Sequence, residues 1–145
     1  MKKEKDIIGV IYALPINLAE RIFRNNKNIF VKFMTHNTKN IQLEEKDKLL
    51  IYISNSNKKI MGEAVIKKIE FLYVKELKKK YGDKIFINNN ELNLYKDGRE
   101  NKLLLVLILD KIKKYTHEKY IDFPISMSGK YITKKDYNKI IRGSK

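Results

Sequence analysis

DKLLIYISNSNKKIMGEAVIKKIE, residues 47–70, is the stretch of sequence around which the predicted fold is built. Its first part is rich in β-branched and aromatic residues, its middle is a polar turn, and its last part alternates apolar with polar or small residues, so we expect two paired strands. Leu49, Ile51 and Ile53 share one face of the first strand, because successive side chains point to opposite faces. Gly62 in the second strand indicates a bulge or a close approach of another backbone, which suits the bend of a curled sheet or small barrel.

Further strand and helix patterns lie on both sides of this hairpin. The segment Lys102 to Tyr115, with the apolar run LLLVLIL at 103–109, predicts a strand that is buried on both faces in the middle of the sheet. Thr133 and Asp136 have the spacing of a capping box and predict a last helix. The polar segment from Met34 to about Lys46 predicts a long loop, and loops of this length are often functional. The other expected elements are strands at 7–12 and 29–33, a helix led by Pro15, helices ending near Gly82 and Tyr95, and an irregular strand or loop at 122–132.

Together these patterns predict a mixed α/β fold with a small curled sheet of five to six strands and peripheral helices. A chain of 145 residues that is 43% hydrophobic fits one domain, residues 1–145, with a substantial core. The longest apolar run falls far short of the roughly 20 residues that a membrane helix needs, so we expect no membrane span. The chain has no cysteine and no convincing secretory signal, so we expect a cytosolic protein without disulfides.

The formal net charge of +15 is the strongest feature of the composition. Lysine and arginine neutralise phosphates, so a charge of this size favours an anionic partner such as nucleic acid. Nearly all of the 32 basic residues are lysines, in a chain that is also rich in Ile and Asn. A compositional bias of this kind places lysines at any solvated position, so much of the charge can be surface without a partner. Basic residues nevertheless outnumber acidic ones in every third of the chain. We therefore expect an anionic partner.

The order of these elements resembles the PUA-like superfamily, and within it the ASCH and EVE domains. The resemblance covers the whole chain and includes a helix led by proline, a short basic strand and a long loop. The chain looks most like an uncharacterised archaeal group of PUA-like domains. The resemblance implies a PUA-like pseudo-β-barrel that binds RNA or a modified base in a cleft between the helix-to-strand segment and the barrel mouth. Its two strand motifs are D-x-L-x-I-Y-x-S, at Asp47, Leu49, Ile51, Tyr52 and Ser54, and I-x-G-x-A-x-I, at Ile60, Gly62, Ala64 and Ile66.

The ASCH signature G-x-K-x-x-E-x-R is only partly matched, by NNKNIFVK at residues 25–32. Lys27 matches its lysine and Lys32 takes the place of its arginine, but Phe30 stands where the family has glutamate or threonine. Some ASCH domains are small amidohydrolases that act on acetylated nucleosides, and that polar residue is part of their chemistry. The departure at Phe30 therefore favours binding over catalysis and leaves an enzymatic activity open.

Two groups of residues are candidates for contacts with a nucleic acid. Arg24, Lys27 and Lys32 would place cations at the end of the first helix and the start of the second strand, where they can hold a phosphate, although a solvated helix end explains them equally well. Tyr52 and Ser54 share a strand face and can stack on and hydrogen-bond a base, unless Tyr52 simply packs in the sheet. Tyr12, together with Ser126, Ser128 and Lys130 of SMSGK, extends the same idea, since Ser and Gly can bring backbone N–H groups to an anion.

Catalytic and metal-binding residues are sparse. Glu63, beside Gly62, can serve as a general base near the cleft or can be an ordinary strand glutamate. His36 and His117 without any cysteine make no metal site, so we expect neither a metal nor a cofactor. We hypothesise an RNA-binding domain that recognises structured or modified RNA through a basic cleft. The alternatives are a small hydrolase of a modified nucleoside that uses Lys27, Lys32 and Glu63, and a reader of a modified DNA base.

Overall fold

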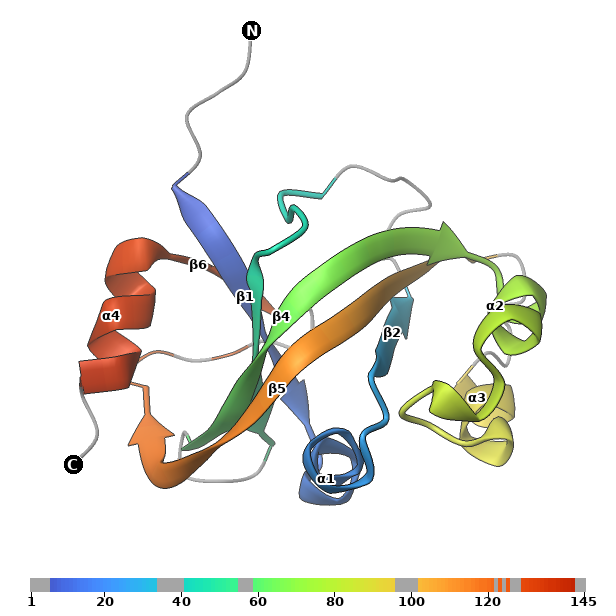
Figure 1. The fold of residues 1–145 in the computed structure, drawn as a ribbon, viewed down its shortest axis with the longest axis horizontal. Coiled ribbons are helices and arrows are strands. Elements are labelled where there is room, and N and C mark those ends of the chain that lie inside the picture. The colour runs from blue at the N-terminus through green and yellow to red at the C-terminus, as the bar shows by residue number, and fades with distance from the viewer. Residues whose placement is uncertain are drawn as a thin grey trace, which may run out of the picture.

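A computed structural model of the chain describes residues 6–33, 41–54, 59–95, 102–121, 123, 125 and 129–142, and these residues form a six-stranded, strongly curled sheet with peripheral helices (Figure 1). The strands follow the order β2-β5-β4-β3-β1-β6 across the sheet. β1 and β3 are parallel, whereas the other neighbouring strands are antiparallel. The strands are β1 (Ile7–Leu14), β2 (Ile29–Phe33), β3 (Lys48–Ile53), β4 (Lys59–Leu72), β5 (Leu104–Tyr120) and β6 (Lys130–Thr133).

The predicted hairpin of residues 47–70 forms β3 and β4 at the centre of the sheet. β4 and β5 are the longest strands and run side by side as two curved arrows in Figure 1. Their register shifts at three places, and bulges of this kind increase the bend and twist of a sheet. One shift falls next to Gly62, where an added Cβ would overlap the carbonyl oxygen of Lys113 and lie 2.7 Å from the ring of Phe23. The predicted bulge and close approach at this glycine are therefore confirmed.

The two faces of the sheet bury separate sets of apolar side chains. Leu49, Ile51 and Ile53 belong to the larger cluster inside the curled sheet, as their shared face predicts. Leu50 points to the other face and packs in a smaller cluster with Ile140. That cluster is covered by the helix at the end of the described chain, α4 (Lys134–Arg142). Residues 104–109 of the apolar run lie in β5, which is buried between β2 and β4 as the sequence predicts.

In Figure 1, α2 and α3 lie on the opposite side of the sheet from α4, and α1 lies below the middle of the sheet. Pro15 immediately precedes α1 (Ile16–Asn25), and Asn26 ends this helix in the left-handed conformation with φ 56°. The connection between β4 and β5 contains α2 (Val74–Tyr81), the short 3₁₀ turn η1 (Gly82–Lys84) and α3 (Asn89–Tyr95). None of the helices in the described part of the chain is both long and apolar enough to cross a membrane.

Local capping patterns are confirmed, whereas several expected boundaries are wrong. The Thr133 hydroxyl accepts a hydrogen bond from the Asp136 backbone at 3.1 Å, and the Asp136 carboxylate accepts one from the Thr133 backbone at 3.0 Å. The first strand runs on to Leu14, β4 reaches Leu72 and β5 reaches Tyr120, because pairing with neighbouring strands extends each one past its local pattern. Residues 34–40 of the expected long loop lie outside the described residues, as does His36.

Candidate functional site

A cavity of about 310 Å³ lies where β1 meets α1, and we call it the aromatic cavity. Its walls include Tyr12 of β1 and Pro15 directly before α1, Phe30 and Lys32 of β2, and Phe86 of the segment before α3. Three segments far apart in the sequence therefore meet here. The volume is at the low end of the range of roughly 300–1,000 Å³ that is typical of small-molecule sites.

Three aromatic rings form a continuous row along this cavity. The centroids of Tyr12 and Phe30 are 5.3 Å apart with an interplanar angle of 18°, and those of Phe30 and Phe86 are 5.1 Å apart at 27°. The Lys32 Nζ lies 5.4 Å from the centroid of the Tyr12 ring, within the range of a cation–π interaction. Tyr12, Phe30 and Phe86 are 7%, 2% and 4% exposed, so a ligand in the cavity would meet the accessible edges of this row. The cavity thus combines aromatic edges with the cation of Lys32, and the Glu91 carboxylate also lines it.

The glycine of the SMSGK motif completes one side of the row. Gly129 has φ +87°, and an added Cβ would overlap the ring of Tyr12 and lie 2.9 Å from the carbonyl oxygen of Ile11. The chain entering β6 therefore packs directly on this tyrosine. The next residue, Lys130, is exposed, with its Nζ 5.2 Å from the centroid of the Phe123 ring. The candidates Ser126 and Ser128 lie outside the described residues.

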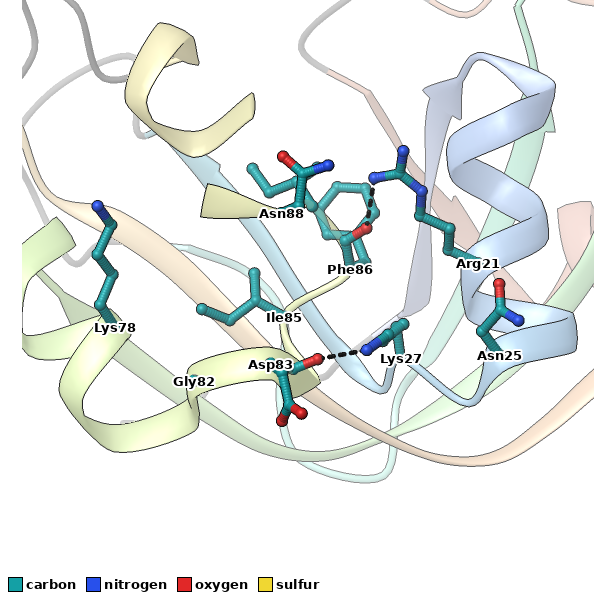
Figure 2. A pocket seen from close by; sticks show the side chains of 10 residues that line it. Arg21, Asn25, Lys27, Lys78, Gly82, Asp83, Ile85, Phe86 and Asn88 are labelled. Atoms are coloured by element: carbon teal, nitrogen blue, oxygen red, sulfur yellow. Dashed lines mark hydrogen bonds between the residues drawn. The ribbon is translucent and has the colours of Figure 1, made fainter. Parts of the chain in front are cut away.

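A second, larger cavity of about 630 Å³ lies beside the first, and we call it the basic cavity. Figure 2 shows Arg21 from α1 and Lys78 from α2 on opposite sides of it, with Lys27 below. The Lys27 Nζ donates a hydrogen bond to the carbonyl oxygen of Asp83 at 2.6 Å, and the Lys78 Nζ donates one to Asn93 Oδ1 at 2.8 Å. Each lysine therefore holds its position through a neutral oxygen.

An ion pair stands between the two cavities. Arg21 lines the basic cavity and Glu91 lines the aromatic cavity. The guanidinium donates to both carboxylate oxygens, one of them at 2.8 Å, and also to the carbonyl oxygen of Phe86 at 3.3 Å. The hydrogen bond from Arg21 lowers the pKa of Glu91. Glu91 also accepts the Asn88 N–H at 2.8 Å while Asn88 Oδ1 accepts the Glu91 N–H, a capping box that begins α3.

Glu63 lies elsewhere, between the sheet and α4, and lines neither cavity. Its Oε1 accepts hydrogen bonds from the hydroxyls of Tyr115 and Tyr137, each at 2.7 Å, and its Oε2 lies 3.1 Å from the Lys48 Nζ. Burial raises the pKa of Glu63, but these three hydrogen bonds outweigh it, so the pKa is below its ordinary value. The carboxylate is thus charged and fully bonded. This arrangement is that of a structural anchor for α4.

The structure places the other predicted site residues in different surroundings. Tyr12 and Lys32 meet in the aromatic cavity and Lys27 lines the basic one. Arg24 is exposed on α1, pairs with Glu20 at 3.6 Å and lines neither cavity. Tyr52 packs against the smaller apolar cluster on the α4 side of the sheet. The Ser54 N–H donates to the carbonyl oxygen of Leu14 at 2.9 Å.

Among the residues that line the cavities and that sequence reasoning missed are Arg21, Lys78, Phe86 and Glu91. It also read Phe30 only as a departure from the ASCH signature. Arg21 and Glu91 are far apart in the sequence, so no local pattern signals their ion pair. The spacing of Asn88 and Glu91 is the one usable signal, because it marks the start of a helix whose first turn carries a carboxylate.

The curled six-stranded sheet and the helix after its first strand define a protein of the PUA-like fold. The ASCH protein from Zymomonas mobilis superposes with a TM-score of 0.77 at 17% identity, over 95% of this chain and 96% of that one. The N-terminal domain of McrB from Staphylothermus marinus superposes with a TM-score of 0.59 at 14% identity, over 98% and 99%. At these identities the likeness shows the fold alone, and the predicted PUA-like fold is confirmed.

Within that fold, residues 7–134 match the family model described as "Domain of unknown function (DUF365)". Since this match spans most of the chain, the protein belongs to the DUF365 family. No curated protein sequence matches the chain.

Proposed function

We propose that this protein is an RNA-binding domain that holds one base in the aromatic cavity. The row of Tyr12, Phe30 and Phe86 with the nearby cation of Lys32 is the observation that carries the proposal. Proteins that read unpaired RNA bases stack them on aromatic side chains and hydrogen-bond their edges. A cavity of about 310 Å³ has room for one base and leaves a modification on it in contact with the walls.

The PUA-like fold supports the same proposal, because the resemblance implies a cleft beside the helix-to-strand segment, and β2 at the end of that segment lines the aromatic cavity. The formal charge of +15 favours a polyanionic ligand over a neutral one. With this function we propose one domain over residues 1–145 and a location in the cytosol.

The hydrolase alternative receives no support from the arrangement of its three residues. Lys32 lines the aromatic cavity, Lys27 lines the basic cavity, and Glu63 lies under α4. A general base must come within hydrogen-bond reach of the proton that it removes. Because Glu63 already accepts three hydrogen bonds, we do not assign it that role.

The test of this proposal compares the RNA affinity of a variant that loses one cation at the aromatic cavity with that of a variant that loses one cation elsewhere. Lys32→Gln removes the charge beside Tyr12, and Lys67→Gln removes an exposed charge of β4 that lines neither cavity. Fluorescence anisotropy with a labelled structured RNA and a duplex DNA of equal length, each at several salt concentrations, measures the affinity. We expect Lys32→Gln to weaken RNA binding about tenfold, which corresponds to roughly 1.4 kcal/mol, and Lys67→Gln to change it less than threefold.

Equal losses for the two variants would refute a base site in the aromatic cavity. Stronger binding of duplex DNA than of RNA would refute RNA as the ligand and favour the reading of a DNA base. Binding that is weak for both nucleic acids and vanishes as salt rises would show that the charge acts without a shaped site.

A further inference from the structure

We propose that the basic cavity binds the sugar–phosphate backbone next to the base, so that the ligand is an oligonucleotide and not a free nucleoside. This inference rests on the proposed function, because it takes the base to lie in the aromatic cavity. It assigns Lys27 and Lys78, with Arg21, to phosphate contacts at a site formed by α1 and the residues that follow it, by the α2–η1 segment and by the segment before α3.

The lysines of this cavity differ from three described lysines whose charge is paired with a carboxylate. Lys48 forms an ion pair with Glu63 at 3.1 Å, and Lys68 and Lys80 form ion pairs with Glu70 at 3.0 and 2.7 Å. Within the part of the chain that the structure describes, no carboxylate pairs with either Lys27 or Lys78, whose ammonium groups bond neutral oxygens. An ammonium has three donors, so each lysine keeps two N–H groups and its full charge for a ligand.

The floor of the cavity indicates an electrostatic contact. Ile85, Phe86 and Ile87 line it, but their exposed fractions are only 4%, 4% and 8%. A ligand would therefore bury little apolar surface here, and binding would depend on the cations and on the amides of Asn25 and Asn88. Asp83 also lines the cavity, so a phosphate would bind on the side of the cations and away from this carboxylate. Phosphate oxygens accept hydrogen bonds from lysine, arginine and asparagine alike.

The position of the cavity gives the connection to the base. Phe86 and Ile87 line both cavities, so one layer of side chains separates the two sites. The ion pair of Arg21 with Glu91 lies in the same partition and holds the guanidinium on the basic side. Because the two cavities share these walls, the basic cavity is the neighbouring site for the phosphates of an oligonucleotide whose base enters the aromatic cavity.

The experiment compares Lys27→Ala, Lys78→Ala and the double variant with Lys79→Ala. Lys79 is exposed on the same helix as Lys78 but does not line the cavity, so it controls for the loss of charge. The probe is a labelled eight-nucleotide single-stranded RNA, titrated from low to physiological salt. Each lost phosphate contact should reduce the slope of log K against log salt by about 0.7, so the double variant should lose about 1.4. Lys79→Ala should leave the slope within about 0.3 of the wild-type value.

A second probe of the same length in which every nucleotide is abasic separates this inference from the proposed function. Loss of Lys27 and Lys78 should weaken binding of both probes equally, whereas Lys32→Gln should weaken only the binding of the probe that has all its bases. Slopes of the double variant equal to that of Lys79→Ala would overturn the backbone site and leave the base site standing. If the double variant weakens binding and Lys32→Gln does not, the base site is overturned and the backbone site stands. If neither probe binds, both sites are overturned. Urea unfolding of each variant identifies any loss of affinity that is due to unfolding.

Discussion

Replacing Glu63 by glutamine should lower the free energy of unfolding by about 2–3 kcal/mol, although the two side chains are nearly identical in shape. The carboxylate accepts hydrogen bonds from Tyr115, Tyr137 and Lys48, and bonds to a charged group are each worth roughly 1.5–3 kcal/mol against about 1 for neutral ones. An amide removes the charge from all three bonds and cannot accept from the lysine with its NH₂ group. Lys48 is 29% exposed, so water offsets part of this loss.

The same prediction has a pH dependence with a definite sign. The pKa of Glu63 is lower in the folded protein than its ordinary value of 4.5, so its contribution to stability is fully present above about pH 4.5. This contribution decreases as the pH falls from there through the lowered pKa. The gap in stability between the wild type and Glu63→Gln should therefore be constant from about pH 6 to pH 8 and should narrow below pH 4.5. Other carboxylates titrate in both proteins and cancel in the difference.

Urea denaturation followed by circular dichroism at several pH values measures both effects, and an unchanged m-value supports a common unfolded state. Glu45→Gln is the matched control, because Glu45 is exposed, and it should change stability by less than about 0.5 kcal/mol. A gap below about 1 kcal/mol for Glu63→Gln, or a gap that does not change between pH 3 and pH 7, would refute the reasoning that a charged, fully bonded carboxylate anchors α4.

Two further predictions concern the hairpin and α2. Gly62→Ala should lower the free energy of unfolding by about 2–3 kcal/mol, because the added Cβ would overlap the Lys113 carbonyl oxygen. Gly82→Ala should lower it by only about 1 kcal/mol, because Gly82 has φ +57° but lies in open space. Equal midpoints of urea unfolding for the two variants would contradict this prediction. Burial raises the pKa of Glu70, but hydrogen bonds from Lys80, Tyr81 and Lys68 outweigh burial and lower the pKa to about 2. Tyr81→Phe removes one of these hydrogen bonds and should therefore raise the pKa of Glu70. An NMR titration of the Glu70 carboxyl carbon that is unchanged in this variant would contradict the prediction.

Features set by neighbouring residues could be predicted from the sequence. The alternation of Leu49, Ile51 and Ile53, the glycine at the bulge and the Thr133–Asp136 capping box are all local, and the structure confirms each. The PUA-like fold could be predicted as well, because its motifs lie within the central hairpin, where such local patterns are strongest.

The candidate site could be predicted only in part, because it depends on contacts between distant segments. Tyr12 and Lys32 were singled out individually, but the row that joins Tyr12 to Phe30 and Phe86 exists only once β1, β2 and the segment before α3 meet. Glu63 has the pattern of an ordinary strand glutamate, and only the packing of α4 on that face makes it buried. The alternation of apolar and polar residues along one strand does not show that Glu63 is buried.

The pairing of β2 also has a consequence for how the protein is made. β2 carries Phe30 and Lys32, yet Ile29 to Phe33 pair with Ile108 to Leu104, so most of the polypeptide must leave the ribosome before this strand has its neighbour. Contacts between residues so distant in sequence form slowly, because the loop that they close costs entropy before any contact compensates for it. A nascent or truncated chain that ends before β5 would lack this support for one wall of the aromatic cavity.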